Sequence, residues 1–191
     1  METETLAGTR GAYRLTSAPQ TIWVPASVQA ILAARIDRLT PGDKQLLQTA
    51  AVVGKDVPLS LLAAIAQTDD EALRRGLGRL QVAEFLYEAS LFPELEYTFK
   101  HALTHEVAYG SLLSERRRAA HAQIVEAIER LPAERLSEHV EQLAHHAIRA
   151  ETWEKAVRYL REAGQRARAR SANREAVGCF EQALVASSSR E

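Results

Sequence analysis

The stretch Phe85-Leu-Tyr-Glu-Ala-Ser-Leu-Phe-Pro-Glu-Leu-Glu-Tyr-Thr-Phe99 decides the predicted fold. It marks the point where helical spacing of apolar residues gives way to two short runs that favour strands. Residues 85–89 and 95–99 are rich in aromatic and β-prone side chains, and the five residues 90–94 between them include a proline. Two such runs around a short connection predict a β-hairpin with helical segments before and after it.

Two helices are predicted well upstream of this hairpin. Ser27 is the expected N-cap of the first, which runs to about Leu39 and carries one apolar stripe. The second has Thr40 as its N-cap and Pro41 as its first residue, and it ends before Gly54. Proline just inside a helix start and glycine just past its end are typical boundary residues.

Two more helices fill the gap up to the hairpin. Val57-Pro58 begins a short helix through Ile65, and Thr68-Asp-Asp-Glu71 matches a capping box that opens the next one. Short helices followed by a hairpin are the order of a winged helix. We therefore predict a winged-helix-like domain over residues 26–113.

The chain beyond the hairpin is predicted to be entirely helical. One helix covers 102–113, a connecting helix occupies 114–136, and residues 137–191 form an incomplete array similar to tetratricopeptide repeats. Small residues at fixed spacing let antiparallel helices approach closely in such an array. The expected packing positions are Ala156, Leu160, Ala163, Gly164, Ala167, Ala176, Phe180 and Ala183.

Composition narrows the classes of function. The 191 residues carry a formal net charge of −1 and a single cysteine, so no intrachain disulfide is possible. A balanced charge argues against nonspecific nucleic-acid binding, and no apolar run reaches the roughly 20 residues that span a bilayer. The amino-terminal residues lack the basic and apolar regions of a signal peptide. We expect a cytoplasmic protein with no membrane contact.

Catalytic and cofactor motifs are absent from the sequence. It contains no Gly-x-x-x-x-Gly-Lys-Ser/Thr loop, so the chain has no backbone cradle for ATP phosphates, and we expect no cofactor and no enzymatic activity. His101 and His105 share one helix face but lack a third metal ligand. His145 and His146 are adjacent, so we expect one to face solvent and the other to pack.

Arg74, Arg75 and Arg79 lie on the helix that would be the recognition helix of a DNA-binding winged helix. They are candidate contacts for a partner or for nucleic acid. Acidic residues surround them. The hairpin connection 90–94, which would be the tip of the wing, is apolar and acidic rather than basic. Both features disfavour binding of nucleic acid. A DNA-binding winged-helix regulator with a helical oligomerisation or effector tail stays open as the alternative function.

Several blocks resemble bacterial STAND-class ATPases, in particular those linked to adenylate or guanylate cyclases. The blocks are Val24-Pro-Ala-Ser-Val-Gln-Ala-Ile-Leu-Ala-Ala-Arg-Ile-Asp-Arg-Leu39, Leu47-Gln-Thr-Ala-Ala-Val-Val-Gly54, Glu96-Tyr-Thr-Phe-Lys-His-Ala-Leu-Thr-His-Glu-Val-Ala-Tyr109 and Ala144-His-His-Ala147. The resemblance extends from about Gly11 to Ser187, with the blocks in the order of that family.

The resemblance implies a role for the chain inside a larger protein. An AAA-type ATPase domain that uses ATP or ADP with magnesium would precede it in cis, and residues 1–25 would form a hairpin or the tail of that domain's lid. The helical repeats would bind a protein partner. Phe99-Lys-His101 resembles the family's hydrophobic-x-His signature, whose histidine approaches the phosphates of bound ADP, although Ala102 replaces the acidic residue that often follows. The expected fold is mainly α with small β-hairpins, and the expected function is non-catalytic regulation.

Overall fold

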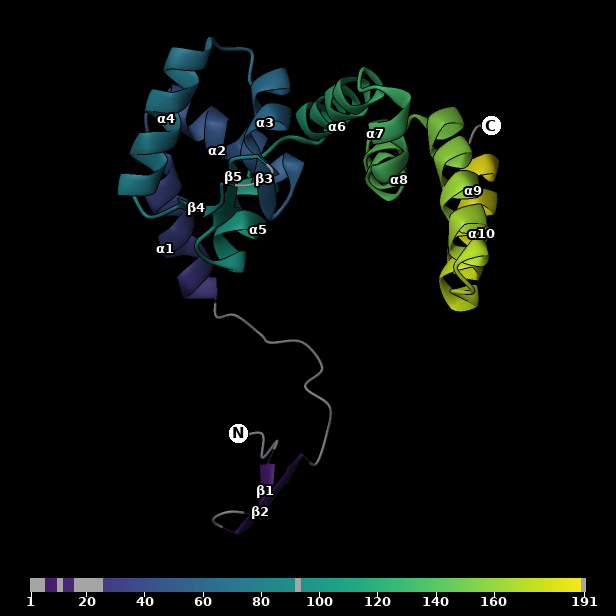
Figure 1. Ribbon diagram of the computed structural model, residues 1–191. Coiled ribbons are helices and arrows are strands. Elements are labelled where there is room, and N and C mark those ends of the chain that lie inside the picture. The colour runs from purple at the N-terminus through teal and green to yellow at the C-terminus, as the bar shows by residue number, and fades with distance from the viewer. Residues whose placement is uncertain (1–5, 10–11, 16–25, 92–93, 190–191) are drawn as a thin grey trace.

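The computed structural model describes residues 6–9, 12–15, 26–91 and 94–189. The described part of the chain is mostly helical, with a small three-stranded antiparallel sheet, so the expected fold class is confirmed at this level. In Figure 1, the helices between residues 26 and 110, α1–α5, surround the sheet, and those between residues 114 and 188, α6–α10, extend from them as a curved arm; we call these two parts the sheet region and the arm. No helix in the described ranges is both long enough and apolar enough to cross a membrane.

The two helices at the start of the sheet region are α1 (Ala26–Asp37) and α2 (Pro41–Val53). The predicted boundaries of α2 are confirmed: the Thr40 hydroxyl accepts a hydrogen bond from the Asp43 amide, and Gly54 is the C-cap. The boundaries predicted for α1 are wrong by one or two residues. It begins before Ser27, which is therefore inside the helix and not its cap, and it ends before Leu39.

Residues Asp56–Pro58 form a strand, β3, where a helix start was predicted. Helix α3 (Leu59–Ile65) follows directly. Val57 is fully buried and lies opposite Tyr97 of a strand about 40 residues further along the chain. A three-residue strand has no periodicity of its own, so its pairing partner alone stabilises it, and local sequence patterns do not reveal it.

Helix α4 (Asp70–Val82) is capped by Asp69 and not by Thr68, so the predicted capping box is wrong: the residue three after the cap is Ala72 and not Glu71. The Asp69 carboxylate accepts a hydrogen bond of 2.7 Å from the Ala72 amide. A carboxylate caps more strongly than a hydroxyl because its charge also interacts with the positive end of the helix dipole.

The predicted hairpin is confirmed and consists of β4 (Leu86–Ser90) and β5 (Glu96–Phe99). The sheet order is β3-β5-β4, so the last strand lies in the middle. Phe85, Tyr97 and Phe99 are buried as expected for core aromatics, whereas Tyr87 is half exposed.

A separate amino-terminal hairpin consists of β1 (Leu6–Thr9) and β2 (Ala12–Leu15). The β-prone runs Gly11–Leu15 and Thr21–Val24 predict the two strands of one hairpin, and β2 covers most of the first run. The structure pairs β2 with β1, which precedes it in the chain. The other predicted strand, Thr21–Val24, lies outside the described residues, as does Trp23.

The arm begins after α5 (Ala102–Gly110), which ends three residues before its predicted end. Ser114 is the first residue of α6 (Ser114–Glu129), whose N-cap is Leu113. The predicted connecting helix is in fact α6 followed by a distinct short helix, α7 (Ala133–Glu138), because Pro132 interrupts the helical backbone hydrogen bonds. Helix α6 packs against α2 and α3, so the arm is seated on the sheet region.

Three antiparallel helices complete the arm: α8 (Val140–Arg149), α9 (Trp153–Ala169) and α10 (Asn173–Ser188). The two connections between them have the same geometry, 20 residues apart. Glu151 and Ser171 both adopt left-handed backbone angles, with φ of 56° and 62°. After each, an amide donates to a carbonyl five residues earlier, Thr152 to Ala147 and Ala172 to Ala167. Both are Schellman-type helix ends.

Candidate functional site

His101 lies at the junction of β5 and α5, as predicted. It is the N-cap residue of α5, with extended backbone angles and an exposed side chain that makes no capping hydrogen bond. Its carbonyl accepts hydrogen bonds from the amides of Thr104 and His105. The backbone is therefore fixed on both sides, and the imidazole projects from the surface of the sheet region.

The three arginines of α4 differ in their surroundings. Arg79 makes a bidentate ion pair with Asp43 of α2, with contacts of 2.7–3.1 Å. This hydrogen bond lowers the pKa of the Asp43 carboxyl, which is almost fully buried. Arg75 pairs with Glu71 on its own helix, and Arg74 is exposed on the same helix. The three side chains therefore do not form a single uncompensated basic surface.

The predicted repeat-packing residues lie where the arm helices meet. The alanines and Leu160 among them are buried. Gly164 of α9 faces the Phe180 ring of α10, and a Cβ built at Gly164 would lie 2.7 Å from that ring. The absence of a side chain at Gly164 therefore sets the close approach of α9 and α10.

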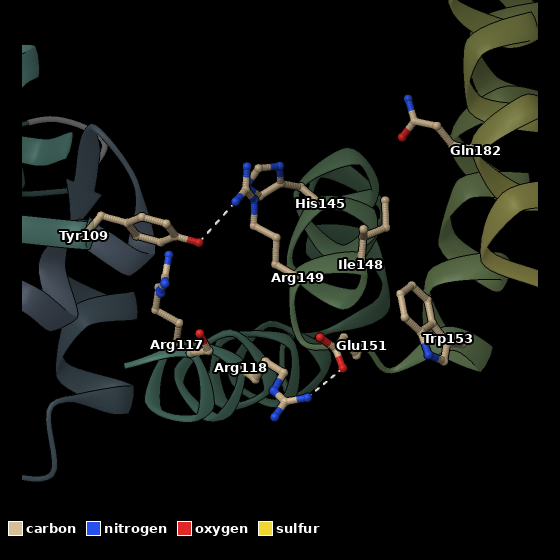
Figure 2. Close-up of a pocket in the computed structure, with 10 residues that line it drawn as sticks. Tyr109, Arg117, Arg118, His145, Ile148, Arg149, Glu151, Trp153 and Gln182 are labelled. Atoms are coloured by element: carbon tan, nitrogen blue, oxygen red, sulfur yellow. Dashed lines mark hydrogen bonds and ion pairs between the residues drawn. The ribbon is translucent and has the colours of Figure 1, made fainter. Parts of the chain in front are cut away.

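A cavity of about 750 Å³ opens where α5, α6 and the later arm helices meet (Figure 2). We call it the arginine pocket. Its lining residues are Tyr109, Ser114, Arg117, Arg118, His145, Ile148, Arg149, Glu151, Trp153 and Gln182. Figure 2 shows Arg117 from α6 and Arg149 from α8 reaching toward Tyr109 of α5. Their guanidinium carbons lie 5.2 and 5.8 Å from the centre of the Tyr109 ring.

A hydrogen-bond chain runs inward from this pocket. Arg149 donates to the Tyr109 hydroxyl over 3.1 Å, and that hydroxyl lies 3.0 Å from Nε2 of His121. Nδ1 of His121 lies 2.8 Å from Nδ1 of His146. Because arginine only donates, the Tyr109 hydroxyl accepts from Arg149, and the direction of its contact with His121 depends on the imidazole tautomer. At the contact between the two Nδ1 atoms, one imidazole donates and the other accepts.

His121 and His146 are both 1% exposed, at the contact between α6 and α8. Burial lowers the pKa of His121 to about 4 and that of His146 to about 3, and the nearby Arg149 adds to both effects. Both imidazoles are consequently neutral at physiological pH, and the contact between their Nδ1 atoms needs one of the two to be unprotonated. His145, by contrast, is exposed and accepts a hydrogen bond from Arg149, so the expected division between these adjacent histidines is confirmed.

Aromatic ring contacts continue the same line into the sheet. The Phe99 ring at the end of β5 meets His105 edge-on, and His105 stacks on Tyr109 at 6.2 Å. His105 also donates from Nε2 to the Ala51 carbonyl over 2.9 Å. A row of rings therefore connects the sheet, through α5, to the buried histidines of the arm.

Within the described residues, no group of three or more His, Cys, Asp or Glu side chains is arranged to hold a metal ion. No protein-family model, curated protein or solved structure matches the chain.

Sequence patterns alone missed the hydrogen-bond chain. One signal was present: His121 lies beside the apolar stripe of α6, one turn before Ile124 and Val125. A histidine at that position is buried if the stripe is buried, and a buried imidazole needs polar partners. The partners come from two other helices, which no local pattern identifies.

Proposed function

We propose that the chain is a non-catalytic regulatory segment of a multidomain signalling ATPase of the STAND class, often linked to a nucleotide cyclase. In this proposal the sheet region contacts an upstream ATPase domain in cis, and the arm binds a protein partner. The observation that carries the proposal is the chain from Arg149 through Tyr109 to the two buried histidines. It joins α5, the helix that follows His101, directly to α6 and α8 of the arm.

The topology of the sheet region supports the winged-helix part of the proposal. Helices α2, α3 and α4 precede the β4–β5 hairpin, and the short strand β3 lies between α2 and α3. The strand order β3-β5-β4 is the one that a winged helix would have. The hairpin is then the wing, and α5 leads away from it toward the arm.

The packing of the arm supports the tetratricopeptide-like part. Successive antiparallel helices meet through alanine and glycine, as in the contact between Gly164 and Phe180. Val177, Leu184 and Val185 of α10 are more than half exposed. This apolar face is suited to contact with another helix or with a protein partner.

A role for His101 follows from its position. Exposed and fixed between strand and helix, it is suited to donate a hydrogen bond to a nucleotide phosphate held by a neighbouring domain. That contact would form only when the two domains are closed, and so would couple nucleotide state to the orientation of α5.

The test is His101→Ala in a protein that includes the upstream ATPase domain. Loss of one charge-assisted hydrogen bond should weaken ADP binding by about 1.5–3 kcal/mol, measured by calorimetry. Glu106→Ala, an exposed change on the same helix, is the matched control and should leave ADP affinity unchanged. Equal affinities of the parent and a folded His101→Ala variant would show that His101 is structural.

A further inference from the structure

The arginine pocket contains more positive charge than its own side chains neutralise. Three arginines line it against a single carboxylate, that of Glu151, which pairs with Arg118 at 2.7 Å. Among the described residues, neither Arg117 nor Arg149 has a carboxylate within ion-pairing distance. An anion that enters the pocket would therefore be attracted to both guanidinium groups.

The position of these two arginines is fixed by contacts other than ion pairs. Arg149 uses Nε on His145 and one terminal nitrogen on Tyr109, and Arg117 lies over the Tyr109 ring. Both guanidinium groups are therefore oriented before any ligand arrives. Preoriented donors bind a ligand more tightly, because less side-chain entropy is lost on binding.

We propose that the arginine pocket binds a small phosphate monoester, with Arg117 and Arg149 as its main contacts. A phosphate monoester carries nearly two negative charges at neutral pH, which matches the two arginines that lack a carboxylate. Guanidinium groups bind phosphate oxygens through paired hydrogen bonds. The proposal does not depend on an upstream ATPase domain.

The size and walls of the pocket indicate the rest of the ligand. Its volume of about 750 Å³ is within the range of small-molecule sites and is much larger than a phosphate ion. Ile148 and Trp153 give it an apolar side, while Ser114 and Gln182 add hydrogen-bonding groups. This mixture suits a phosphorylated metabolite with hydroxyl groups, such as a sugar phosphate.

A ligand at this position would also affect the arm. Arg149 is the first donor of the chain that ends at His146, and the pocket is lined by residues from α5, α6, α8, α9 and α10. A bound phosphate would hold Arg149 and Arg117 together and so fix α8 relative to α6. The ligand would therefore stabilise the arrangement of the arm on the sheet region.

The test is calorimetric titration of the whole chain at physiological salt with glucose 6-phosphate, inorganic phosphate, glucose and succinate. We expect a dissociation constant below about 1 mM for glucose 6-phosphate, weaker binding of inorganic phosphate and no binding of glucose. Arg117→Gln and Arg149→Gln should each weaken glucose 6-phosphate binding by about tenfold or more. Arg116→Gln is the matched control, since Arg116 is exposed on the same helix and does not line the pocket.

Three results would overturn the proposal. The first is no heat of binding for either phosphate compound at 10 mM, a concentration about tenfold above the expected constant. The second is tighter binding of succinate than of both phosphate compounds, which would assign the pocket to dicarboxylates. The third is an equal loss of affinity in Arg116→Gln and Arg117→Gln, which would indicate general charge attraction. Arg117→Gln keeps the test decisive if Arg149→Gln fails to fold.

Discussion

The sheet region and the arm are stabilised in different ways. The sheet region has a core of large aliphatic side chains, and Leu47, Leu77 and Leu80 are completely buried in it. In the arm, α9 and α10 meet mainly through alanines and Gly164, while α6 and α8 carry the buried polar pair His121 and His146 together with buried aliphatic side chains. Large apolar cores supply stability, whereas close helix contacts and buried polar pairs restrict the chain to one arrangement.

Leu77→Ala should cause the largest loss of stability. Removing a fully buried leucine side chain leaves a cavity and typically costs about 2–5 kcal/mol. Urea denaturation measures the change. Val82→Ala on the same helix is the control, because that side chain is 87% exposed, and its effect should be small. Similar losses in the two variants would show that the sheet region is not the stabilising core.

Acid should destabilise the arm through the histidine pair. The pKa values of His121 and His146 in the folded protein, about 4 and 3, lie below the usual 6.5. The unfolded chain therefore takes up protons that the folded chain excludes, and stability falls as the pH drops below about 6.5. Between pH 7 and 5 the loss should be at most about 2 kcal/mol for each histidine.

The check for this effect is a double variant, His121→Gln with His146→Gln, compared with the parent by urea denaturation at pH 7 and 5. This range lies above the ordinary titration of carboxylates, so the histidines dominate the difference. The variant should lose less stability than the parent over the same interval. Parallel pH dependence in the two proteins would contradict the buried, neutral assignment.

Gly164→Ala should destabilise the contact between α9 and α10 by about 1–3 kcal/mol, because the new methyl group would overlap the Phe180 ring. Gly178→Ala is the matched control: nothing lies within 4 Å of a Cβ built there, so the better helix former should stabilise α10 by up to about 1 kcal/mol. Adding Phe180→Leu to Gly164→Ala should restore part of the loss. Thermal melting distinguishes these outcomes.

Ser171→Gly should have the smallest effect on stability, and it should stabilise the protein, whereas Leu77→Ala and Gly164→Ala destabilise it. Ser171 holds left-handed backbone angles at a helix end, where glycine is favoured, so the change should stabilise the arm by about 0.5–1 kcal/mol. A raised midpoint of thermal unfolding is the expected result. A lowered midpoint would mean that the Ser171 side chain stabilises the folded protein by more than its strained backbone angles destabilise it.

The sequence predicted those features that depend on neighbouring residues. The cap at Thr40, the hairpin around residues 90–94 and the adjacent but divergent His145 and His146 all follow from local patterns. The strand β3 and the hydrogen-bond chain do not, because their partners are far along the chain. The ion pair of Asp43 with Arg79 could not be predicted for the same reason. It joins α2 to α4, and no local sequence pattern relates the two positions.

The repeated turn at Glu151 and Ser171 has a consequence for how quickly the two regions form. Each turn closes through hydrogen bonds that span five residues, and α8, α9 and α10 each pack on their neighbour in the chain. The strand β3, in contrast, must find β5 across about 40 residues. Short loops close at little entropic cost, and structures with local contacts fold faster. During refolding, helix contacts in the arm should therefore precede completion of the sheet.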